Sequence, residues 1–224
     1  MDIDNVTRRW HEVKDRLPAG VKLVAVSKHV PVELIAGLYA AGQRAFGENR
    51  VQELERKREA LPPDIEWHAI GHLQTNKVRL VAPYVSMIHG VDSARLLEAI
   101  DREAERAGRV IPCLLQFRVA TETSKFGMTE REVRALLESE EFARMKHARV
   151  AGVMAMATFT RDEALVRGEF ARARELFEAL KRDYFADDAG FNVLSMGMSG
   201  DYRLAVQEGS TLVRLGSALF RGDE

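Results

Sequence analysis

Short apolar segments and amphipathic segments alternate along the whole chain. Between the apolar segments, hydrophobic residues recur at spacings of three and four, as at Leu34, Ile35 and Leu38, which is the period of an amphipathic helix. Eight runs rich in Val, Leu, Ile and Met are predicted to form buried strands, at 21–27, 45–48, 66–70, 86–91, 111–119, 149–157, 193–198 and 211–219. Strand and helix in regular alternation predict an α/β fold with parallel strands.

The number of repeats favours a closed barrel over an open sheet. No glycine fingerprint of a nucleotide-binding fold follows the first strand, which argues against a doubly wound sheet. We therefore predict a single (β/α)8 TIM barrel over residues 1–224, because no linker or change of composition marks a second domain. An extra amphipathic helix precedes the first strand, with apolar positions at Ile3, Val6, Trp10, Val13 and Leu17. We expect it to cover the bottom of the barrel.

Composition and charge narrow the classes of partner. Hydrophobic residues make up 46% of the 224 residues and charged residues 30%, which is ordinary for a globular protein with a full core. The 33 basic and 34 acidic residues give a net charge of -1, so the chain as a whole has no basic footprint for nucleic acid or anionic membrane. The amino-terminal segment has no signal-peptide pattern and no apolar run could span a bilayer, so a cytoplasmic protein with small-molecule ligands is expected. The single cysteine, Cys113, has apolar neighbours and is predicted to be buried and unreactive.

The first strand runs directly into a lysine in the segment LVAVSKHV. Strand alternation places Val24, Val26 and Lys28 on one face, so a lysine that follows inward-facing valines rises into the mouth of the barrel. A lysine at a strand end commonly sends its ammonium to water. A desolvated lysine is instead a nucleophilic amine suited to forming a Schiff base with an aldehyde, such as a sugar phosphate or pyridoxal phosphate.

The last two predicted strands carry groups suited to an anion. Alternation along GSTLVRLGSALF turns Arg214 inward, either toward an anionic or planar acceptor or into a structural ion pair with a carboxylate of a neighbouring strand. Ser199 and Gly200 follow the seventh strand, and Gly216 and Ser217 lie next along the eighth. These loops form the common phosphate site of this barrel, although GMSGD could also be a plain turn in which Asp201 starts a helix.

The second strand ends in FGENRVQE. Asn49 shares a face with the small residues Ala45 and Gly47, which we expect to leave room for a flat group in the barrel mouth. The alternative is that Asn49 only caps the following helix. On that helix, Glu53 and Lys57 are predicted to form an exposed pair at a spacing of four residues.

Two further strand ends carry polar residues. His68 and His72 have no third partner at metal-ligand spacing, so no metal site is predicted, and a contact with the ligand face or a capped loop is expected instead. Lys125 lies in a polar loop after the fifth strand, where a solvated lysine is expected.

Taken together, the motifs resemble those of the pyridoxal phosphate homeostasis protein family, small relatives of the alanine racemase amino-terminal barrel. The resemblance covers nearly the whole chain through LVAVSK, FGENRVQE, EWHAIGHLQTNK, TSKFGM, GVMAM, SMGMS and GSTLVRLGSALF. It implies a TIM barrel that binds pyridoxal 5'-phosphate (PLP) and maintains the intracellular pools of PLP (vitamin B6) and amino acids. It also implies PLP-dependent apoenzymes as possible recipients of the cofactor, and a monomer or weak dimer is expected.

The resemblance also implies roles for individual residues. Lys28 would form the Schiff base and Asn49 would sit beside the pyridine ring. Arg214 would face the ring nitrogen, and Lys125 would handle cofactor near the mouth of the barrel. The phosphate would be held by Ser199, Gly200, Gly216 and Ser217.

The chain departs from the family at three positions. Val30 stands where many members have a second lysine, Gly200 where a larger or acidic residue is common, and Arg221 where glycine is usual. A PLP-dependent amino-acid racemase or a Schiff-base aldolase is the alternative to a non-catalytic carrier. A racemase needs a second base, which alanine racemases supply as a tyrosine through an additional domain. Because this sequence ends at Glu224, we expect no such domain and no such base.

Overall fold

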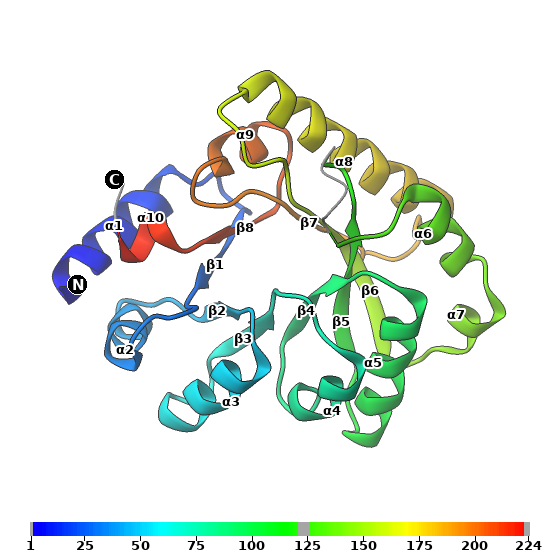
Figure 1. The fold of residues 1–224 in the computed structure, drawn as a ribbon, viewed down its shortest axis with the longest axis horizontal. Coiled ribbons are helices and arrows are strands. Elements are labelled where there is room, and N and C mark those ends of the chain that lie inside the picture. Colours follow the sequence, from blue (N-terminus) through cyan, green and yellow to red (C-terminus); the bar gives the residue numbers. More distant parts are fainter. Residues whose placement is uncertain (1, 121–125, 222–224) are drawn as a thin grey trace.

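The computed structural model describes residues 2–120 and 126–221, and within them eight parallel strands close into a barrel in chain order (Figure 1). The strands are β1 (Lys22–Val26), β2 (Ala45–Glu48), β3 (Glu66–Ala69), β4 (Met87–Val91), β5 (Ile111–Phe117), β6 (Ala148–Ala155), β7 (Val193–Ser195) and β8 (Leu212–Leu215). β1 pairs with both β2 and β8, which closes the ring. The predicted α/β barrel is confirmed.

Helices connect the strands around the outside of the barrel (Figure 1). They are α1 (Ile3–Arg16), α2 (Val32–Ala40), α3 (Val51–Ala60), the 3-10 turn η1 (Thr75–Lys77), α4 (Val78–Val81), α5 (Ala94–Arg106), α6 (Glu130–Leu137), α7 (Glu140–Arg144), α8 (Glu163–Tyr184), α9 (Tyr202–Gln207) and α10 (Ser217–Phe220). Several strands are shorter than the apolar runs predicted. β8 ends at Leu215, and the residues expected to continue it form α10 instead.

The amino-terminal helix α1 exists as predicted, but its expected position was wrong. It lies in the outer ring, against α2 on one side and α10 on the other, rather than across the bottom of the barrel (Figure 1). Arg9 of α1 donates to the carbonyl oxygens of Leu219 (2.8 Å) and Phe220 (3.2 Å) in α10, which follows the carboxyl end of β8. Because α10 is only four residues long, α1 supplies the apolar surface that a full-length helix after β8 would otherwise provide.

The inner face of the barrel is densely packed where the sequence suggested free space. Gly47 of β2 faces inward as expected, but a Cβ there would lie 2.9 Å from side-chain atoms of both Val24 and Ile70. The room left by this glycine is therefore filled by neighbouring strands rather than kept for a flat ligand group. Cys113 on β5 is fully buried, as predicted. In the part of the chain that is described, no helix combines the length and apolarity needed to span a bilayer.

Candidate functional site

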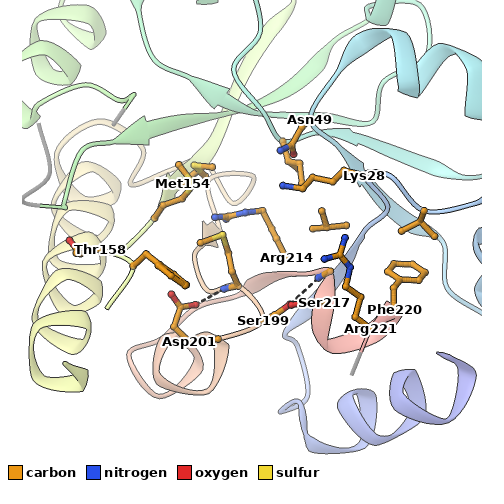
Figure 2. A pocket seen from close by; sticks show the side chains of 18 of the residues that line it. Lys28, Asn49, Met154, Thr158, Ser199, Asp201, Arg214, Ser217, Phe220 and Arg221 are labelled. Atoms are coloured by element: carbon orange, nitrogen blue, oxygen red, sulfur yellow. Dashed lines mark hydrogen bonds between the residues drawn. The ribbon is translucent and has the colours of Figure 1, made fainter. Parts of the chain in front are cut away.

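A cavity of about 550 Å³ opens at the carboxyl ends of the strands. It brings together all seven residues singled out from the sequence: Lys28, Asn49, Ser199, Gly200, Arg214, Gly216 and Ser217. Figure 2 shows Lys28 and Asn49 to one side of Arg214, and Ser199 and Ser217 to the other. Lys125 falls outside the described residues, so its predicted role stays a prediction.

Lys28 lies in a tight turn just after β1. The Val30 N–H donates to the Ser27 carbonyl oxygen at 2.9 Å, and His29 has a left-handed backbone with φ 60°. This conformation is uncommon for a residue other than glycine, so the surrounding structure has to hold it. Lys28 is exposed within the cavity, which corrects the expectation of a desolvated amine for the protein by itself. Val30 is buried and lines the same cavity.

The loops after β7 and β8 are joined by the Ser199 side chain. Its Oγ accepts a hydrogen bond from the backbone N–H of Gly216 at 3.1 Å (Figure 2). It also accepts one from the backbone N–H of Ala218 at 3.1 Å. Asp201 Oδ1 accepts from the Met198 N–H at 2.6 Å and so closes the first loop on itself. Backbone N–H groups and hydroxyls therefore converge at one end of the cavity, which is the arrangement that binds phosphate in this fold.

Arg214 projects from β8 into the barrel and is 3% exposed. Its guanidinium donates to the Ser195 carbonyl oxygen (2.9 Å), to Ser195 Oγ (2.6 Å) and to the Ala155 carbonyl oxygen (3.2 Å). The structural ion pair with a strand carboxylate, considered above, is therefore not what holds it. Burial lowers the pKa of Arg214 to about 10, although the negative charge of Asp201, in the same cavity lining, acts in the opposite direction. Arg214 therefore remains a cation at neutral pH and faces the cavity.

Two buried histidines continue this network across the barrel interior. His89 Nδ1 lies 3.1 Å from Ser195 Oγ, and His89 Nε2 lies 2.8 Å from His68 Nδ1. Ser195 Oγ accepts a hydrogen bond from Arg214. An arrangement consistent with this is that the Ser195 hydroxyl donates to His89 Nδ1 and His89 donates from Nε2 to His68 Nδ1, with both rings neutral. The positive charge of Arg214 favours the neutral form of the nearby His89 ring. Burial lowers the pKa of His68 to about 4 and lowers that of His89 well below its usual value.

These histidines should make stability depend on pH. Between about pH 4 and 6.5 the two histidines bind more protons in the unfolded chain than in the folded protein. Lowering the pH through this range therefore favours the unfolded chain, so the folded protein is most stable above pH 6.5 and loses stability as pH falls. His68 alone should lower the free energy of unfolding by about 2 kcal/mol between pH 7 and pH 5. Urea unfolding at the two pH values measures this. His11→Gln, at an exposed histidine, should keep the loss, whereas an undiminished loss in a His68→Gln/His89→Gln variant would contradict the assignment.

Other predicted polar residues lie at the rim or outside it. Asn49 is exposed to the cavity and is not the cap of α3, which is Arg50. His72 Nδ1 lies 2.9 Å from Asp92 Oδ2, and its ring stacks on that of Phe126. Among the described residues, no three His, Cys, Asp or Glu side chains are grouped as metal ligands.

Of the pair predicted to be exposed on α3, Lys57 is buried and Glu53 is partly buried. The side chain of Lys57 is 1% exposed and that of Glu53 is 18% exposed. Lys57 Nζ lies 2.5 Å from Glu48 Oε1, between α3 and the outer face of β2. The predicted exposure of this pair was wrong because a spacing of four residues shows that two helical side chains are neighbours but not whether they face solvent.

Comparison with known proteins shows which family this chain belongs to. Residues 1–224 match the family described as alanine racemase, N-terminal domain. The pyridoxal phosphate homeostasis protein of Aquifex aeolicus is 38% identical over 222 residues, covering 97% of this chain and 95% of the relative. The chain belongs to the pyridoxal phosphate homeostasis protein family.

Solved structures agree with this membership. PipY of Synechococcus elongatus PCC7942, described with PLP bound, has 37% sequence identity and a TM-score of 0.87, over 96% of this chain and 99% of PipY. Alanine racemase of Clostridium difficile shares the fold, with a TM-score of 0.73 at 15% identity over 97% of this chain and 59% of the racemase.

In this member of the homeostasis family, further residues line the cavity besides the seven candidates. They are Val26, Val30, Ile70, Met154, Met156, Thr158, Phe159, Thr160, Met198, Asp201, Phe220 and Arg221. Met154, Met156 and Thr158 alternate along and beyond the end of β6, so the inward period of two was available as a signal. Phe159 and Thr160 belong to a loop whose path no local pattern specifies.

Proposed function

We propose that this protein binds PLP in the cavity, holds it through a reversible Schiff base on Lys28, and serves PLP homeostasis. One observation carries the proposal: an accessible lysine amine, a buried arginine cation and two phosphate-binding loops line a single cavity in a member of this family. The name of the Aquifex relative and the PLP described in PipY support the same ligand.

The residues fit the three chemical parts of PLP. The aldehyde requires an amine, which Lys28 offers at one side of the cavity (Figure 2). The dianionic phosphate requires hydrogen-bond donors and open backbone, which the loops of Ser199 and Gly216 provide; a Cβ on Gly200 would meet no atom within 4 Å. The flat ring requires apolar walls, which Ile70 and Met154 supply.

The position of Arg214 favours a protein that binds the cofactor without strongly activating it for catalysis. A permanent cation that donates toward the ring nitrogen disfavours protonation of that nitrogen, and a protonated ring is the stronger electron sink. The carbonyl oxygens of Ser195 and Ala155 hold the guanidinium in place, so it is not free to withdraw. PLP in this cavity would be bound but weakly activated.

The tyrosines also favour a non-catalytic carrier. None of Tyr39, Tyr84, Tyr184 and Tyr202, all within the described residues, lines the cavity. Tyr39 donates to Asp64 and Tyr184 to Glu138, so their hydroxyls are engaged elsewhere. Without a tyrosine on the opposite face of the ligand, racemisation lacks its usual second base. We infer that PLP-dependent apoenzymes are the recipients of the cofactor.

The test is an absorption spectrum of the purified protein with and without added PLP, followed by borohydride reduction and peptide mass mapping. We expect a visible band whose reduction fixes the cofactor on Lys28. A spectrum equal to that of free PLP, with Lys28 unmodified after reduction, would overturn the proposal. Incubation of the loaded protein with D- or L-alanine then measures turnover, which should not exceed that of free PLP.

A further inference from the structure

A buried ion pair lies directly behind the turn that carries Lys28. Lys57 reaches from α3 to the outer face of the barrel, and its ammonium contacts three acceptors: the Ser27 carbonyl oxygen at 2.6 Å, Glu48 Oε1 at 2.5 Å and Glu53 Oε2 at 3.4 Å. Ser27 Oγ donates to the same Glu48 oxygen at 2.7 Å. Lys57 is fully buried and Glu48 is 1% exposed.

Hydrogen bonds of this network hold the backbone of the turn on both sides of Lys28. On the amino-terminal side, Ser27 is held through its carbonyl oxygen and its hydroxyl. On the carboxyl-terminal side, the His29 N–H donates to Glu53 Oε2 at 3.2 Å, and His29 Nδ1 lies 3.4 Å from Glu53 Oε1. Lys28 lies between two anchored residues and points the other way, into the cavity (Figure 2).

The backbone of the turn depends on these anchors. A left-handed conformation costs a residue other than glycine about 1 kcal/mol or more, and His29 adopts it with φ 60°. The contacts with Glu53 compensate for that cost at His29 itself. If they were released, the turn could relax to another conformation and the direction of the Lys28 side chain would change.

We propose that Glu53, Lys57 and Glu48 form a positioning network that fixes the Lys28 turn, so that the amine meets an aldehyde held by the phosphate loops. The inference rests on the proposed function and extends it to residues that do not touch the ligand. The reaction they assist adds the unprotonated Lys28 amine to the aldehyde carbon, forming one C=N bond and releasing the aldehyde oxygen as water.

A buried ion pair is a weak source of stability, which favours a geometric role. Desolvation of both charges offsets much of their attraction, and an apolar pair of similar size is often as stable. Glu48 Oε2 is buried with no hydrogen-bond partner among the described residues, so this carboxylate depends on Lys57. What the ion pair supplies specifically is a set of directional bonds from α3 to the backbone next to Lys28.

The main test variant is Glu53→Gln, which keeps the shape and removes the charge. Glu59→Gln on the same helix makes the same change at an exposed position and is the matched control. Lys57→Met alone would leave the buried Glu48 carboxylate without its cation and could prevent folding. The second test is therefore the neutral double variant Glu48→Gln/Lys57→Met.

Three measurements separate positioning from general structure. Amide hydrogen exchange of the protein without ligand reports on the turn, and the His29 and Val30 amides should exchange at least about tenfold faster in Glu53→Gln, because their anchors are weakened. Stopped-flow absorbance after mixing with PLP should show imine formation slowed about tenfold, as expected for a misplaced reacting group. Binding of pyridoxine 5'-phosphate, which has the ring and phosphate but no aldehyde, should change by less than about twofold because the phosphate loops are untouched.

The outcomes are distinguishable. Slower imine formation with unchanged pyridoxine 5'-phosphate binding, in Glu53→Gln and the double variant but not in Glu59→Gln, supports the positioning role. Imine formation at the wild-type rate in folded variants overturns it while leaving the proposed function intact. A parallel loss of imine formation and analogue binding shows a merely structural role and also overturns it. If the wild-type protein itself forms no imine, the proposed function fails and this inference fails with it.

Discussion

Lys28→Ala should abolish the fixation of PLP by borohydride while leaving the barrel folded. The side chain is exposed in the cavity, so its removal deletes no core contact. The free energy of unfolding should therefore change by no more than about 0.5 kcal/mol, the usual effect of a surface substitution. The visible band should be lost completely, because within the cavity lining Lys28 is the only lysine among the described residues.

The matched control is Lys181→Ala, which removes an exposed lysine from α8, outside the cavity lining. It should keep both the band and the labelled peptide. Retention of PLP after reduction of Lys28→Ala, with the label mapped to another lysine, would contradict the assignment. Pyridoxine 5'-phosphate should still bind to Lys28→Ala, because the phosphate loops remain.

Ser217→Glu should reduce PLP binding at least about 100-fold. Ser217 is the first residue of α10, in the cavity wall next to the backbone N–H groups that bind Ser199 Oγ. A carboxylate about 5 Å from a phosphate repels it by about 3 kcal/mol per unit charge at an effective dielectric constant near 20, and phosphate carries nearly two charges. Equilibrium dialysis with pyridoxine 5'-phosphate measures the loss directly, without the covalent step.

Ser217→Gln provides the comparison, since it has the same size without the charge. It should weaken binding far less than the glutamate. Equal weakening by both variants would mean that bulk rather than charge is responsible, and unchanged binding in Ser217→Glu would show that the phosphate lies elsewhere. High salt should partly restore binding to the glutamate variant, because screening weakens the repulsion.

The sequence predicted which side chains of β1 and β8 face into the barrel, because strand periodicity is a strong local constraint. Once β1 and β8 are recognised, a period of two decides that Val26 and Arg214 face inward. The convergence of Lys28 with the phosphate loops followed from the rule that active sites of this fold lie at the carboxyl ends of the strands. Neither step required knowledge of the helices.

The outward-facing layer was predicted poorly. Lys57 looked exposed because helix α3 is charged on most of its surface, and only tertiary packing shows that one lysine is turned inward. Inside the barrel, the hydrogen bonds of His89 with His68 and Ser195 join β4 to β3 and to the distant β7, and no local spacing signals them. The position of α1 depends on the shortness of α10, which an apolar run at the end of β8 concealed.

The pairing of β1 with β8 determines when the cavity at the carboxyl ends of the strands can form during synthesis. Lys22 pairs with Leu212, so the Lys28 amine next to β1 is synthesised well before the proposed phosphate-binding residues next to β8. A nascent chain that has not yet released β8 from the ribosome carries Lys28 but lacks Arg214, Gly216 and Ser217. If PLP binds at these residues as proposed, its capture has to follow barrel closure, and the β1–β8 contact that closes the barrel has a very high sequence separation and is correspondingly slow to form.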